Sequence, residues 1–109
     1  MKLQEIAAKL ELEKLTPAFD KEVTGVYISD MVSDVIANAK AGNLLVTVQV
    51  HANALAAANL VDIAGIIVAQ GKRPADDVVK RAEKAEISIF ATALSRWQVA
   101  TKLYEAGLR

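Results

Sequence analysis

Two nearly continuous apolar runs constrain the fold of this chain more than any other feature. They are LLVTVQV at residues 44–50 and GIIVA at residues 65–69. Strands in a parallel sheet are covered by helices on both faces, so side chains pointing to either face are apolar. The runs therefore predict two central strands of a mostly parallel sheet.

Helical and strand patterns alternate along the rest of the chain. Leu3, Ile6 and Leu10 follow the spacing of one helical stripe, and Ala41-Gly42-Asn43 is a helix stop. The expected helices are residues 2–10, a segment from Ser29 or Asp30 to about Lys40, and residues 52–61, 75–86 and 94–106. The other expected strands are residues 12–15, residues 22–28 ending at Ser29, and residues 87–90. This order predicts an α/β fold: a single three-layer domain over residues 1–109, with a mostly parallel sheet and helices on both faces.

Composition excludes several kinds of site and partner. The 109 residues contain no cysteine, so they form no disulfide and no thiolate zinc site. Thirteen basic residues balance thirteen acidic ones, which favours neither nucleic acid nor a membrane surface as a partner. No apolar run has the roughly 18 residues that a bilayer span needs. We expect a cytoplasmic protein with no metal site and no cofactor.

The segment ANALAAANLV at residues 52–61 contains only two polar residues, Asn53 and Asn59. A helix that is apolar all round is normally buried on all sides, and a small domain has little mass to cover one. We expect a second copy of the chain to cover it in a homodimer; the alternative is a central helix enclosed within the monomer. In a dimer Ala57→Glu would be disruptive, whereas in a monomer it would be tolerated.

The last expected helix carries a stripe that we assign to the core. Its members are Leu94, Trp97, Ala100, Leu103 and Tyr104. Trp97 is expected to pack inside, and the alternative is a platform on which a ligand stacks.

Polar residues that follow the apolar strands are candidates for ligand binding. Ligands of open α/β sheets bind outside the carboxyl ends of the strands. The candidates are Ser29, Asp30, Gln49, His51, Asn53, Gln70, Gly71, Lys72, Arg73 and Thr92. Two cations and several helix N-termini suit a phosphate or carboxylate. The alternative is that Ser29, Asn53 and Thr92 only cap helices, while Lys72 and Arg73 extend into solvent.

Two further groups have both a chemical and a structural interpretation. Asp30, Asp34 and Asn38 are spaced on one helical face, where carboxylates bind Mg²⁺ or simply complement the helix dipole. His51 is the only histidine, and the chain has no GxSxG nucleophile motif beside which it would act as a base. We favour the dipole for the acidic residues and a turn or hydrogen-bonding role for His51, and we expect no catalytic residue.

The order of several motifs resembles the DRTGG domain in its small stand-alone form. The resemblance begins at about Glu22 and rests on SDMVSDVIANAKAGNL (29–44), the strand leading to H-x-N at His51 and Asn53, and AGIIVAQGKRP (64–74). Together with the closing TALSRWQVATKLYEAG (92–107), these motifs cover most of the chain.

The resemblance implies a fold related to the N-terminal domain of HPr kinase/phosphorylase and a regulatory, dimerising role. In the wider family the domain accompanies phosphotransacetylase domains and lies between CBS modules of some pyrophosphatases. The chain departs from the namesake motif, since Asp-Arg falls on Val50 and His51, and Thr-Gly-Gly falls on residues 69–71, where only Gly71 survives. It also lacks a phosphate-binding loop that would support kinase activity.

These observations lead to three functional hypotheses. The first is a non-catalytic homodimeric regulatory module that senses a small anionic metabolite or nucleotide and acts on a metabolic enzyme or regulator. The second is a purely structural dimerisation adaptor without a ligand. The third is a small enzyme that uses His51 with Asp30 or Asp34.

Overall fold

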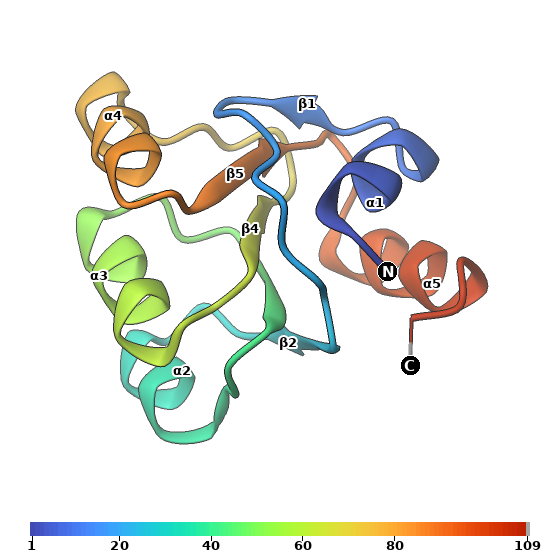
Figure 1. Cartoon of the computed structure of the whole chain (residues 1–109), viewed down its shortest axis with the longest axis horizontal. Coiled ribbons are helices and arrows are strands. Elements are labelled where there is room, and N and C mark those ends of the chain that lie inside the picture. Colours follow the sequence, from blue (N-terminus) through green and yellow to red (C-terminus); the bar gives the residue numbers. More distant parts are fainter. Residues whose placement is uncertain (109) are drawn as a thin grey trace.

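The computed structural model of the chain describes residues 1–108 and places a sheet between two layers of helices (Figure 1). The helices are α1 (Leu3–Lys9), α2 (Val32–Asn38), α3 (Ala52–Val61), α4 (Asp76–Lys84) and α5 (Arg96–Glu105). The strands are β1 (Glu13–Lys14), β2 (Gly25–Ile28), β3 (Asn43–Thr47), β4 (Gly65–Val68) and β5 (Ser88–Ala91). Within residues 1–108, no helix is long and apolar enough to cross a membrane.

The five strands form one sheet in the order β1-β5-β4-β3-β2. The four strands from β2 to β5 are parallel, and only β1 pairs antiparallel, at the edge beside β5. Helices α2, α3 and α4 lie on one side of the sheet, and α1 and α5 lie on the other (Figure 1). The predicted three-layer α/β fold with a mostly parallel sheet is therefore confirmed.

Successive side chains of the central strands point to opposite faces of the sheet and so contribute to two separate hydrophobic cores. Leu44 and Val46 of β3 pack with α1 and α5, whereas Leu45 between them packs with the other three helices. All three side chains are fully buried. A strand covered on both faces must be apolar at every position, which explains the continuous runs in the sequence.

Two predicted strands are shorter than expected. The strand expected over residues 22–28 is confined to Gly25–Ile28, and the strand expected over residues 44–50 ends at Thr47. Beyond Thr47 the backbone turns, because Val48 N donates a hydrogen bond to a side chain, Asp30 Oδ1, at 2.8 Å instead of continuing the ladder.

Helix α3 has an exposed face in the single chain. The alternative of a central helix enclosed within the monomer is therefore wrong. Ala54, Leu55, Ala57 and Ala58 are buried against the sheet side, but Leu60 is 71% exposed. Asn53, Ala56 and Asn59 share its exposed face. Ala57 is buried inside one chain, so Ala57→Glu is now expected to be disruptive in a monomer as well as in a dimer.

The inward face of α5 differs from the predicted stripe. Val99 and Leu103 are the buried residues of the helix, whereas Trp97 and Tyr104 are 74% and 58% exposed. Core packing of Trp97 is therefore wrong. The buried face is selected by contact with α1 and β3, and three of the five stripe residues lie on the opposite side of the helix.

Candidate functional site

The cap residues at the strand ends are not the ones that the sequence suggested. Helix α2 has Met31 at its N-cap without a side-chain bond, and α5 is capped by Ser95, whose Oγ accepts from Gln98 N at 3.1 Å. His51 caps α3, since its Nδ1 accepts a hydrogen bond from Asn53 N at 3.1 Å. The proposed caps Ser29, Asn53 and Thr92 are therefore wrong. His51 has the turn role that we favoured.

Asp30 joins three segments at the carboxyl ends of the strands. Its Oδ1 accepts from Thr47 Oγ1 at 2.9 Å and from Val48 N at 2.8 Å, and its Oδ2 pairs with Arg96 Nη1 at the start of α5. Because Asp30 precedes α2, it does not share a helical face with Asp34. Its carboxylate connects the turns after β2 and β3 to α5.

Asp34 lies in the first turn of α2 and accepts hydrogen bonds from Tyr27 Oη at 2.8 Å and Asn38 Nδ2 at 2.8 Å. Hydrogen bonds from Ser29, Asn38 and Tyr27 lower the pKa of Asp34, and the hydrogen bond to Asp34 raises the pKa of Tyr27. No group of three or more His, Cys, Asp or Glu residues among residues 1–108 is arranged to hold a metal ion. The position of Asp34 fits the dipole interpretation.

We expect stability to fall at both ends of the pH range through this pair. The lowered pKa of Asp34 stabilises the fold above its unfolded pKa of about 4, and this contribution is lost as the pH falls through the folded pKa. The raised pKa of Tyr27 stabilises the fold below about pH 10, and that contribution is lost as the pH rises through the folded pKa. Urea unfolding at several pH values measures both slopes. Asp34→Asn should reduce the fall in the free energy of unfolding at acid pH, and Tyr27→Phe should reduce the fall at alkaline pH. If neither variant changes its slope, the Tyr27–Asp34 hydrogen bond is not the cause.

A tight turn follows β4 and carries Gly71. Lys72 N donates to Ala69 O at 3.2 Å, and Gln70 and Gly71 both have positive φ, at 61° and 70°. Gly71 N donates to Thr92 O at 2.9 Å and thus joins this turn to the turn after β5. Two consecutive left-handed residues define a type I′ turn, which favours glycine.

Gly71→Ala is expected to destabilise the protein by about 1–2 kcal/mol, because a Cβ disfavours the left-handed region. An added Cβ would meet no atom within 4 Å, so the cost is one of backbone conformation and not of a clash. Urea unfolding measures the change. Gln70→Gly is the matched control, and it should leave stability equal or raise it by up to about 1 kcal/mol. A neutral Gly71→Ala would show that the turn relaxes.

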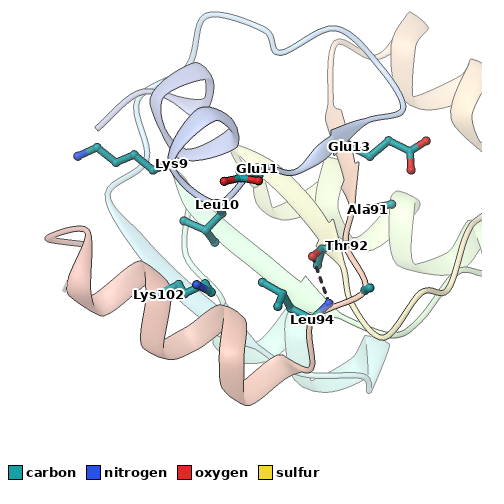
Figure 2. Close-up of a pocket in the computed structure, with 9 residues that line it drawn as sticks. Lys9, Leu10, Glu11, Glu13, Ala91, Thr92, Leu94 and Lys102 are labelled. Carbon is teal, nitrogen blue, oxygen red and sulfur yellow. Dashed lines mark hydrogen bonds between the residues drawn. The ribbon is translucent and has the colours of Figure 1, made fainter.

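Two adjoining cavities lie at the carboxyl end of β5, and we call them together the strand-end groove. The larger cavity, of about 450 Å³, is lined by Lys9, Leu10, Glu11, Glu13, Ala91, Thr92, Ala93, Leu94 and Lys102. The smaller, of about 180 Å³, is lined by Glu13, Gly71, Lys72, Arg73, Ala91, Thr92 and Ala93. Figure 2 shows that the walls of the larger cavity come from α1, the start of β1, the turn after β5 and α5. Thr92 belongs to both cavities, and its Oγ1 accepts from Leu94 N at 3.2 Å.

The groove carries charges of both signs. Arg73 makes a bidentate ion pair with Glu13, with nitrogen–oxygen distances of 2.6 and 2.7 Å. The Arg73 guanidinium lowers the pKa of the Glu13 carboxyl. Lys72 and Lys102 are exposed cations on the walls. An anion in the groove would meet these lysines directly, whereas Arg73 would have to leave or share Glu13.

The structure separates the predicted site residues into three groups. Gly71, Lys72, Arg73 and Thr92 line the groove. Ser29 and Asp30 follow β2, where the Ser29 hydroxyl accepts a hydrogen bond from Met31 N and Asp30 pairs with Arg96. Gln49 and His51 line a hollow of about 10 Å³, with room for at most about one water molecule, and Asn53 follows on α3. Gln70 lies outside these three groups, in the turn after β4, where its backbone N–H donates a hydrogen bond to Leu94 O.

Sequence reasoning missed the groove residues that come from the N-terminal segment and from α5. These are Lys9, Leu10, Glu11, Glu13 and Lys102. The short strand expected over residues 12–15 was the one available signal, because an edge strand beside β5 brings Glu13 to its carboxyl end.

Comparison with known proteins identifies the family of this chain. The sequence profile of the DRTGG domain matches residues 5–106, so the similarity begins well before Glu22. No curated protein matches the chain significantly. A solved structure of the CBS and DRTGG domains of the regulatory region of Clostridium perfringens pyrophosphatase, in complex with its activator diadenosine tetraphosphate, has a TM-score of 0.75 at 17% identity.

The alignment with that structure covers 94% of this chain and 45% of the pyrophosphatase chain. At this identity the similarity shows a common fold, and the chain spans less than half of the matched protein. The profile match extends over nearly all residues. The chain therefore belongs to the DRTGG domain family.

Proposed function

We propose that the protein is a non-catalytic, homodimeric regulatory module that binds a small anionic metabolite or nucleotide in the strand-end groove. The observation that carries the proposal is the gathering of Gly71, Lys72, Arg73 and Thr92 around one cavity at the carboxyl ends of β4 and β5. Ligands of open α/β sheets bind at this edge. The pyrophosphatase relative, a regulatory region, was solved with a dinucleotide activator.

The groove offers an anion two kinds of interaction. Lys72 lines the smaller cavity and Lys102 the larger one, so each supplies positive charge, and the Thr92 hydroxyl supplies a hydrogen bond. Leu10 and Leu94 provide an apolar surface on which the uncharged part of a metabolite packs. A dimer would let such binding act at a distance, since a ligand biases the packing between subunits.

The ligand proposal is tested by thermal shift with inorganic phosphate, AMP, ATP and diadenosine tetraphosphate. A ligand at 100 times its Kd should add about 2.7 kcal/mol to the stability. We expect Lys72→Ala and Lys102→Ala to reduce the shift, and Lys80→Ala, on the exposed face of α4, to leave it unchanged. A flat response to all four compounds would contradict anion sensing.

A flat response would instead favour the structural adaptor, which needs the homodimer but no ligand. The small enzyme is the weakest hypothesis, because His51 Nδ1 is engaged as the cap of α3 and Asp30 is engaged by Thr47, Val48 and Arg96. A turnover that disappears in His51→Ala would promote it.

A further inference from the structure

The outward face of α5 has an aromatic surface with a hollow at its centre. Trp97 and Tyr104 are 74% and 58% exposed, and the smaller residues Ala100 and Thr101 lie between them. These four residues and Glu105, all from α5, line a cavity of about 390 Å³. Tryptophan and tyrosine are enriched among the side chains that dominate the energy of protein interfaces.

The hollow has the shape that receives a side chain from another helix. Trp97, Ala100, Thr101 and Tyr104 are spaced i, i+3, i+4 and i+7, which is the four-residue hole of knobs-into-holes packing. Its floor is made of small side chains and its two ends of aromatic rings. A facing helix can therefore approach the backbone at the centre and place a large side chain against either ring.

The face is complementary to itself. Trp97 and Tyr104 are equally distant from the midpoint between Ala100 and Thr101. If two α5 helices pack antiparallel about a two-fold axis at this midpoint, Trp97 of each copy lies opposite Tyr104 of the other. The small residues of both copies then meet at the crossing point, as an interface that uses the same patch on both subunits requires.

We propose that α5 forms the homodimer interface by packing antiparallel against α5 of a second copy. This inference rests on the homodimer of the proposed function and moves its interface from α3 to α5. The exposed face of α3 offers one large apolar side chain, Leu60, beside Asn53 and Asn59, whereas α5 offers two aromatic rings.

The aromatic rings supply part of the area that a dimer of ordinary size buries. Aromatic side chains have about 150–250 Å² of surface each, and more than half of it is exposed on Trp97 and Tyr104. Four such rings at a two-fold interface supply about a quarter to a third of the roughly 1,600 Å² that a standard interface buries. Helix α1 lies beside α5 in the same layer, so the rest of the interface has to come from α1 and the neighbouring segments (Figure 1).

Light scattering and sedimentation equilibrium on Ala100 variants test this arrangement. Ala100 lies next to the two-fold axis, opposite Thr101 of the other copy and close to its own counterpart, so Ala100→Glu and Ala100→Lys each bring two like charges together. Both substituents are good helix formers, and circular dichroism should show an unchanged fold. We expect a wild-type dimer at tens of micromolar and a dimer Kd at least tenfold higher in each variant. An equimolar mixture of the two variants should form a heterodimer again.

Ala56→Glu on the exposed face of α3 is the matched control and should leave the dimer intact. If both Ala100 variants remain dimers, the α5 interface is overturned; loss of the dimer in Ala56→Glu would then place the homodimer of the proposed function on α3. A mixture that stays monomeric overturns the antiparallel arrangement. A monomeric wild type overturns the α5 interface and the homodimer, while the phosphate and nucleotide shifts still decide separately whether the module binds an anion.

Discussion

Ala57→Glu is expected to destabilise the protein by about 3–5 kcal/mol, enough to unfold many domains of this size. Ala57 is 2% exposed and lies in the core between the sheet and helices α2, α3 and α4. A carboxylate there would be removed from water without a cationic partner, and the longer side chain would also overpack the core. Urea unfolding followed by far-UV circular dichroism, at one protein concentration, measures the loss.

Ala56→Glu is the control for this substitution, because Ala56 is the preceding residue on the exposed face of α3. It introduces the same charge into the same helix, and we expect a change within about 0.5 kcal/mol. Equal effects of the two substitutions would show that the buried face of α3 is assigned incorrectly. The pair thus separates a requirement of the folded chain from any requirement of a dimer.

Asp30→Ala is expected to cost about 2–4 kcal/mol, since it removes a charged acceptor shared by three donors. Thr47 is 1% exposed, so its hydroxyl would lose a partner with little access to water. Val48 N would lose its acceptor, and Arg96 would lose its ion pair. The turns after β2 and β3 would no longer be joined to the start of α5. Urea unfolding measures this loss as well.

Asp30→Asn keeps an acceptor for Thr47 and Val48 but removes the charge that pairs with Arg96, so about half of the loss should remain. Arg96→Ala should resemble Asp30→Asn more closely than Asp30→Ala. If Asp30→Ala were neutral, the carboxylate would not be a structural connection, and its earlier assignment to a ligand site would regain support.

Local sequence patterns determined the number, type and order of the elements. The apolar runs at residues 44–50 and 65–69 became β3 and β4, and residues 52–61 became α3 with the predicted bounds. The reason is that a continuous apolar run and a helical spacing of apolar residues can both be recognised within a short window of sequence. They indicate a strand or a helix wherever that segment lies in the fold. The family resemblance arose from the same local motifs and is confirmed over residues 5–106.

The candidate site was only partly predictable from the sequence. The rule that ligands bind at the carboxyl ends of strands selected Gly71, Lys72, Arg73 and Thr92, which the structure brings to one groove. It also selected Ser29, Asp30 and His51, which do not line this groove. The hydrogen bonds of Asp30 to Thr47 and Arg96 depend on segments far away in the chain, whereas His51 caps its own helix through Asn53 N. The rule could not include Lys9 or Lys102, which reach the groove from helices that no strand-end rule connects to it.

The sequence by itself thus determined the α/β class, the parallel strands and the family, because each depends on patterns within a few neighbouring residues. Only the tertiary structure decided which side of each helix is buried. Helix α5 has apolar residues on two sides, and contact with α1 and β3 selects Val99 and Leu103 for the core, leaving Trp97 and Tyr104 outside. The physical reason is that the burial of a helical face depends on the surface it meets, and that surface is built from residues far away in the chain.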